Sequence, residues 1–147
     1  MKLCSLLLLI FLSSVLNEKQ ILLIEDVNLQ NELGKDYLYY RIKLNEGELK
    51  LSDSLVEQYM LNNHDKYIWT SKVGDYYNYY RQYAGYTQFT PERKVFINAF
   101  KIKNKEISDE FLRNHLYSAL GGGSSFFTIK VNLQTKTCFD LNVNAPR

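Results

Sequence analysis

Residues 127–143 read FTIKVNLQTKTCFDLNV and carry the clearest strand pattern in the chain. Apolar side chains recur at every second position in two runs, which is the period of a strand with one buried face. Residues 134–137 between the runs are polar and predict a turn. The pattern predicts a β-hairpin whose apolar face holds Phe127, Ile129, Val131, Leu133, Phe139, Leu141 and Val143.

Further strands are predicted upstream of this hairpin. Residues 75–87 are dense in tyrosine and residues 94–102 in aromatic and β-branched residues, and both compositions favour strands. The turn signal at residues 90–93 joins them into a second hairpin. Residues 37–44 predict another strand, with Leu38, Tyr40, Ile42 and Leu44 on one apolar face at period two. Residues 21–24 fit a short strand or the end of a flexible lead.

One main helix is predicted between these strands. Residues 28–36 predict a loop and residues 45–48 a turn. Ser54 and Glu57 have the spacing of a capping box, so the helix is expected to begin at residues 52–54. A shorter helix is predicted after Ser108, over residues 109–120, and Gly121–Gly123 would end it. The main helix should end near His64, with an apolar stripe of Leu55, Val56, Tyr59 and Met60.

These elements predict an α+β domain. An antiparallel sheet of about four to five strands, with the main helix packed on one face, would bury both apolar surfaces. This arrangement is cystatin-like. We expect one domain at residues 37–147, a lead or loop at 17–36, and a signal peptide at 1–16. Lys2 before an apolar run is typical of a signal peptide, and the run is shorter than a membrane span. A buried N-terminal helix and an uncleaved anchor are the alternatives.

Composition narrows the function classes. The net charge is +2 and basic residues are not clustered, so the sequence does not favour nucleic-acid binding. Of the two cysteines, Cys4 lies in the signal segment, so the mature chain would hold Cys138 alone and form no internal disulfide. An exported domain without disulfides indicates a bacterial envelope protein, in the periplasm or outside the cell, with no membrane span after signal removal.

The tyrosine-rich strand carries the candidate binding residues. Tyr79, Arg81 and Tyr83 would share the outer sheet face, where an arginine between aromatic rings can bind a carboxylate or a partner. Asn98 would add a polar group to a small-ligand pocket between helix and sheet. The alternative is ordinary packing, with Arg81 tying the strand to its neighbours.

Catalytic and metal-binding patterns are weak. His64 and His115 have no second histidine or cysteine at ligand spacing, so no metal site and no cofactor are predicted. Cys138 would lie opposite Phe139 and Leu141, away from the helix. It is expected to be an inert thiol unless a histidine approaches it.

Several segments resemble a group of small exported bacterial proteins whose activity is not established. The resemblance covers roughly residues 50–145 and rests on residues 80–86, 94–100, 122–127, 131–133 and 141–145. It implies an exported protein and a compact α+β fold. The sequence as a whole predicts a non-enzymatic binding module of the bacterial envelope, with a protein partner. The alternatives are a small-ligand-binding protein and an enzyme of unknown type.

Overall fold

The computed structural model describes residues 21–24, 27–34, 38–63, 73–102, 107–118 and 125–143. The predicted signal peptide at residues 1–16, His64 and Gly121–Gly123 lie outside this part of the chain. The elements, in order, are β1 (Ile21–Leu23), α1 (Gln30–Leu33), β2 (Tyr40–Ile42), α2 (Glu46–Asn62), the 3-10 helix η4 (Val73–Asn78), β3 (Tyr80–Thr87), β4 (Lys94–Phe100), α3 (Asp109–Asn114), β5 (Phe126–Asn132) and β6 (Thr137–Val143).

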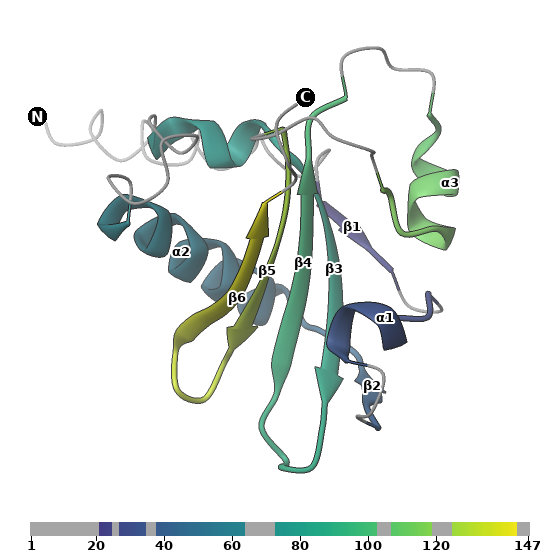
Figure 1. Ribbon diagram of the computed structural model, residues 1–147, viewed down its shortest axis with the longest axis vertical. Coiled ribbons are helices and arrows are strands. Elements are labelled where there is room, and N and C mark those ends of the chain that lie inside the picture. The colour runs from purple at the N-terminus through teal and green to yellow at the C-terminus, as the bar shows by residue number, and fades with distance from the viewer. Residues whose placement is uncertain are drawn as a thin grey trace, which may run out of the picture.

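The strands form one mixed sheet of six strands in the order β1–β3–β4–β5–β6, with β2 also paired to β3 (Figure 1). β1 runs parallel to β3 along residues 81–83, and β2 runs antiparallel to it along residues 85–87. The predicted α+β class is confirmed. The prediction of a wholly antiparallel sheet of four to five strands is wrong, because β1 pairs in parallel with β3 and the sheet has six strands.

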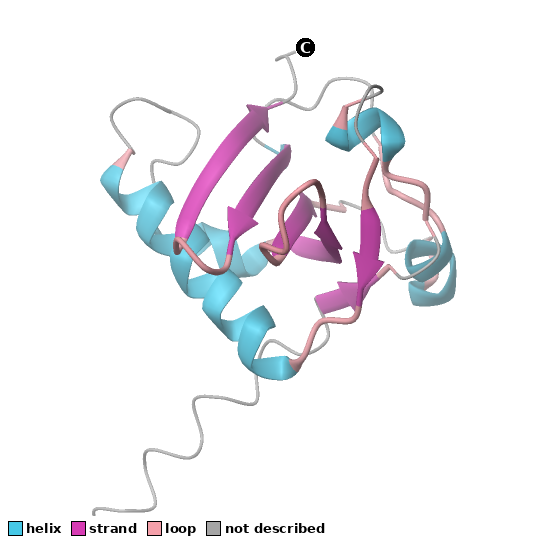
Figure 2. Cartoon of the chain, turned by 90° about the horizontal axis from the view of Figure 1, so that it is seen from below, coloured by secondary structure: helices cyan, strands magenta, loops and turns pink. Residues whose placement is uncertain are grey.

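Helices cover both faces of the sheet. The long helix α2 lies across one face of the sheet (Figures 1 and 2). Its Val56 and Met60 side chains belong to the core cluster on that face. On the other face, Leu33 of α1 and Leu112 of α3 belong to separate apolar clusters. One main helix on one face was expected and is confirmed. The loop predicted at residues 28–36 contains α1, so that prediction is wrong for residues 30–33.

Helix α2 begins earlier than its sequence predicts. Asn45 is the N-cap: its side chain accepts a hydrogen bond from the Glu48 backbone, and the Glu48 carboxylate accepts one from the Asn45 backbone. This capping box satisfies two backbone donors at the helix start. The turn predicted at residues 45–48 and the start predicted at Ser54 are therefore wrong, while the predicted end near His64 agrees with an end at Asn62.

The tyrosine-rich segment is divided between two elements. Residues 73–78 form η4, and β3 begins only at Tyr80, whereas the sequence predicts a strand from residue 75. The Tyr76 hydroxyl donates to Asp53 at 2.8 Å and the Tyr77 hydroxyl to Glu57 at 2.9 Å. Both acceptors lie on α2, so these bonds hold residues 76 and 77 against the helix and delay the start of the strand.

The predicted hairpin at residues 127–143 is confirmed, with a bulge in β6. Thr128 pairs with Asn142 but Lys130 pairs with Phe139, so β6 has one extra residue there. Asp140 in the bulge has a φ of 50°. The extra residue reverses the alternation, so Cys138 packs in the α2-facing core with Leu141. For this reason, the prediction that Cys138 lies away from the helix is wrong, and so is the prediction that Phe139 shares the apolar face, because Phe139 lies on the side of Leu33 and Tyr86.

The remaining elements lie where they are predicted but are shorter. β4 ends at Phe100 rather than at residue 102, and β2 covers only three of the residues from 37 to 44. α3 follows Ser108, whose hydroxyl accepts from the Phe111 backbone at 3.1 Å, so the predicted cap is confirmed. α3 ends at Asn114, well before residue 120.

Candidate functional site

The four residues predicted to bind a ligand or partner are all buried. Tyr79 precedes β3, Arg81 and Tyr83 lie on β3, and Asn98 lies on β4. Tyr79 and Tyr83 belong to the core that faces α2, whereas Asn98 faces the other side of the sheet. The predicted open face around Tyr79, Arg81 and Tyr83 is therefore wrong, because α2 and η4 cover it. A direct binding role for these residues remains a prediction.

Arg81 lies inside a buried group of charged and aromatic side chains, which we call the arginine cluster: Asp53, Tyr76, Tyr77, Arg81 and Tyr83. The centre of its guanidinium group is 5.1 Å from the Tyr76 ring centroid and 5.2 Å from that of Tyr77. Its Nη1 is 3.7 Å from Asp53 Oδ2, which is too long for a hydrogen bond. The other oxygen of Asp53 accepts from the hydroxyls of Tyr76 and Tyr83.

The arginine cluster joins α2 to the sheet by charge more than by hydrogen bonds to Arg81. No described residue accepts a hydrogen bond from the three guanidinium nitrogens of Arg81. Asp53 and the two rings are what compensate its buried charge. Burial, and then the Asp53 charge, raises the pKa of Tyr83 well above its ordinary value. The phenols therefore stay protonated and serve as fixed donors.

On the opposite face, Gln82 and Asn98 form an amide cluster in which the Gln82 side chain is fully paired and Asn98 Oδ1 has no partner among the described residues. Gln82 Nε2 donates to the carbonyls of Leu112 at 2.5 Å and His115 at 2.7 Å. Its Oε1 accepts from Asn98 at 2.7 Å and from the Tyr117 backbone at 3.0 Å. Asn98 Nδ2 also donates to the Tyr117 carbonyl at 2.9 Å. These bonds fasten residues 107–118 to the sheet, which gives Asn98 a structural role.

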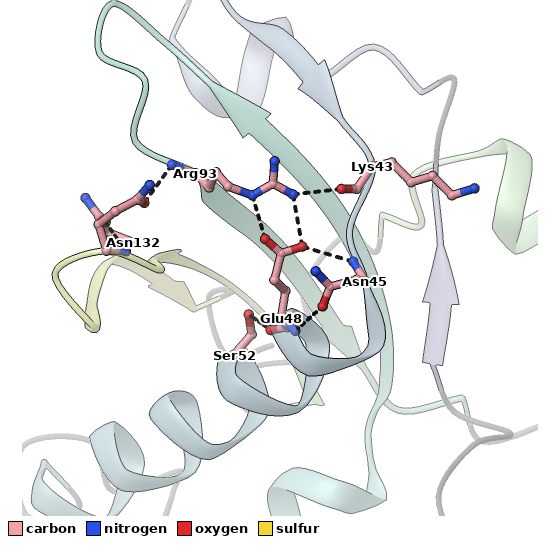
Figure 3. A network of polar contacts seen from close by, with 7 residues as sticks. Lys43, Asn45, Glu48, Ser52, Arg93 and Asn132 are labelled. Carbon is pink, nitrogen blue, oxygen red and sulfur yellow. Dashed lines mark hydrogen bonds and ion pairs between the residues drawn. The ribbon is translucent and has the colours of Figure 1, made fainter.

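A third polar network fixes the start of α2 (Figure 3). Arg93 donates to both oxygens of Glu48, at 2.5 Å from Nε and 3.0 Å from Nη2, and also to the Lys43 carbonyl at 2.9 Å. The hydrogen bond from Arg93 lowers the pKa of Glu48. Because the Glu48 carboxylate binds both the Asn45 backbone and Arg93, it joins the capping box to the β3–β4 hairpin, and we interpret this network as structural support.

The described residues do not bring together a catalytic cysteine and histidine. Burial raises the pKa of Cys138 to about 12, so its thiol is protonated near neutral pH. Cys138 packs on the α2-facing side, whereas His115 follows α3 on the other side of the sheet. Within the described ranges, no group of three or more His, Cys, Asp or Glu side chains could hold a metal ion.

Large apolar side chains are exposed where β2 and β3 meet. Leu38, Tyr40 and Phe89 are 71%, 66% and 75% exposed. Tyr40 pairs with Thr87, and Leu38 and Phe89 lie two residues beyond that pair on either strand. All three therefore lie at one end of the β2–β3 ladder, which we call the exposed apolar end. Figure 1 shows β2 beside the arrowhead of β3.

Two small hollows open near this end. The edge hollow, about 160 Å³, lies where β1 and β2 meet along β3, and Tyr83 is one of its lining residues. The bulge hollow, about 180 Å³, lies between α1, the tip of the β3–β4 hairpin and the bulge of β6. Its lining residues are Leu33, Tyr86, Gln88, Phe89, Lys130, Phe139 and Asp140. Tyr79, Arg81 and Asn98 line neither hollow.

Sequence reasoning missed the exposed apolar end and the bulge hollow. Leu38 and Tyr40 were expected on the apolar face of a longer strand, where they would be buried. Phe89 precedes the turn signal at residues 90–93, and an aromatic residue next to a turn is the one available hint of exposure. Nothing in the alternation of residues 137–143 shows the bulge at Asp140.

No protein-family model, curated protein or solved structure matches this chain. Within the described residues, none of the helices has the length and apolar character needed to cross a membrane.

Proposed function

We propose that this chain is a non-enzymatic binding module that engages a protein partner through the exposed apolar end. The observation that carries the proposal is the exposure of Leu38, Tyr40 and Phe89 at one end of a single strand ladder. Apolar groups gathered on a surface favour protein contacts, and aromatic residues are enriched there. Binding at this end needs no rearrangement of the core.

The compartment belongs to the same proposal. The apolar run at residues 1–16 supports export, and the absence of a second cysteine from the mature chain supports a bacterial envelope. The partner would then be an envelope protein with an apolar contact surface. The cystatin-like arrangement likewise stays a prediction, supported by α2 lying across the antiparallel strands β3 to β6.

The test is affinity capture from an envelope extract with the tagged mature domain. The variant Leu38→Ser, Tyr40→Ser, Phe89→Ser should lose the captured protein while it unfolds at the same temperature as the wild type, since exposed substitutions change stability little. The matched control is Leu61→Ser, which removes an exposed apolar side chain from the last turn of α2. Equal capture by the triple variant and the wild type would refute the proposal.

A second candidate function is small-ligand binding. It is favoured by the bulge hollow, which Tyr86 lines with a hydroxyl that makes no hydrogen bond to a described residue. This hydroxyl is not enclosed, so water reaches it, and an acceptor on a ligand can replace that water. The predicted pocket between the main helix and the sheet is thus replaced by a hollow on the opposite face.

A further inference from the structure

The bulge of β6 shapes one wall of the bulge hollow. Asp140, at a φ of 50°, re-aims the strand so that Phe139 and Asp140 both line the hollow on the α1 side of the sheet. Leu33 of α1 and Phe89 of the hairpin tip complete its apolar walls. A flat apolar group therefore finds aromatic and aliphatic contacts from three separate elements.

Tyr86 and Lys130 supply hydrogen-bond donors to the hollow, beside Gln88 and the Asp140 carboxylate. Burial, and then the Asp140 charge, raises the pKa of Tyr86, so its hydroxyl keeps its proton at neutral pH. That hydroxyl donates to no described residue. The Lys130 ammonium lies 2.9 Å from Asp140 Oδ2. An ammonium has three N–H donors, and the described residues take one of them. Asp140 itself is largely exposed, so water solvates its remaining oxygen.

We propose that the bulge hollow binds a small carboxylate with a flat apolar body. The carboxylate accepts hydrogen bonds from the Lys130 ammonium and the Tyr86 hydroxyl, and the body packs against Phe89 and Phe139. A volume of about 180 Å³ limits the ligand to a small molecule, because drug-sized ligands occupy roughly 300 Å³ or more. The inference rests on the second candidate function and is independent of the proposed protein partner.

The test is an NMR titration of the mature domain with benzoate, with benzylamine as the oppositely charged probe of similar shape. Benzoate should give saturable shifts at residues 86–89 and 130–140, and benzylamine should give none. Lys130→Met should weaken benzoate binding by more than about tenfold, because a charge-assisted hydrogen bond is lost. Tyr86→Phe, which removes only the hydroxyl, should weaken it by about fivefold.

Lys94→Met is the matched control. The side chains of Lys94 and Lys130 are similarly buried, at 16% and 14% exposed, and each has an acidic partner, but Lys94 does not line the hollow. Its substitution should leave benzoate affinity unchanged. Tyr86→Phe should not lower the unfolding temperature without benzoate, because the hydroxyl has no partner to lose. The proposal is overturned if benzoate does not saturate, if benzylamine binds as well, or if either Lys130→Met or Tyr86→Phe matches Lys94→Met.

Phe89 belongs to both the exposed apolar end and the bulge hollow, whereas Leu38 and Tyr40 lie outside the hollow, and Lys130 and Tyr86 lie outside the exposed apolar end. A failure of benzoate binding therefore leaves capture of a protein through Leu38 and Tyr40 untouched. A failure of capture leaves the tests of the hollow at Lys130 and Tyr86 unaffected.

Discussion

Arg81 and Gln82 are neighbours in the chain, yet they belong to two buried clusters with different chemistry. The arginine cluster faces α2 and contains a charge whose guanidinium nitrogens have no hydrogen-bond acceptor among the described residues. The amide cluster faces residues 107–118, and its Gln82 side chain makes four hydrogen bonds at 2.5–3.0 Å. One cluster is held by charge compensation and the other by the hydrogen bonds of Gln82, although Asn98 Oδ1 has no partner among the described residues.

This difference predicts how each cluster responds to substitution. A buried charge depends on its counter-charge, so losing Asp53 leaves Arg81 uncompensated. The amide of Gln82 contributes through its individual hydrogen bonds, so its removal leaves each backbone partner without that bond. Loss of Asp53 should therefore lower the stability of the whole domain. Loss of Gln82 should mainly increase local opening of residues 107–118.

The largest expected effect is that of Asp53→Asn. Removing the carboxylate charge should lower the free energy of unfolding by about 3 kcal/mol, because the Arg81 charge stays buried without compensation. Urea denaturation measures this value. In the double variant Asp53→Asn, Arg81→Met the loss should be smaller, since the charge is gone as well. If Asp53→Asn lowers the free energy of unfolding by less than about 1 kcal/mol, the arginine cluster is not held by charge compensation.

Gln82→Leu should cost somewhat less, about 2 kcal/mol, because the carbonyls of Leu112 and His115 lose their donor. Hydrogen exchange should rise in residues 107–118 before the sheet opens. Unchanged exchange in that segment would show that the amide cluster does not fasten it.

How much of this could be predicted from sequence depends on where the partners come from. The hairpin at residues 127–143 was predictable because its pattern and its partner strand are adjacent in the chain. The burial of Arg81 was not predictable, because its compensating carboxylate, Asp53, lies on α2 and is 28 residues away in the sequence. The parallel pairing of β1 with β3 is similarly remote in sequence.

The start of α2 was missed for another reason. Capping-box spacing occurs at both Asn45–Glu48 and Ser54–Glu57, and the sequence does not rank them. Arg93 from the hairpin binds Glu48 and so supports the first. Of the candidate site, the tyrosine-rich strand was predicted correctly only from residue 80 onward. Its burial and the exposed apolar end depended on tertiary packing.

The third prediction extends the comparison to the partly exposed pair of Arg93 and Glu48. Glu48→Gln keeps the capping hydrogen bonds but loses the ion pair, so it should cost about 0.5–1 kcal/mol at neutral pH. The folded pKa of Glu48 is below its ordinary value, so this stability is present above the unfolded pKa, near 4.5, and is lost as pH falls through the lower folded value.

Urea denaturation of wild type and Glu48→Gln across acidic pH measures that difference. The two proteins should converge in stability below the folded pKa of Glu48. A difference that stays constant through the acidic range would show that the ion pair contributes nothing.

The smallest expected effect concerns Cys138. With a pKa of about 12, its thiol should react with iodoacetamide far more slowly in the native domain than in urea at mildly alkaline pH. Mass spectrometry measures the labelled fraction. Rapid native labelling would contradict the position of Cys138 in the α2-facing core.

The most direct measurement compares capture and stability for two variants side by side. Leu38→Ser, Tyr40→Ser, Phe89→Ser changes the exposed apolar end, and Tyr83→Phe removes one hydrogen bond from the arginine cluster. We predict that the first loses the captured envelope protein and keeps its unfolding temperature, whereas the second unfolds at a lower temperature and keeps the protein. Retention of the protein by the triple variant, together with its loss from folded Tyr83→Phe, would contradict binding at the exposed apolar end.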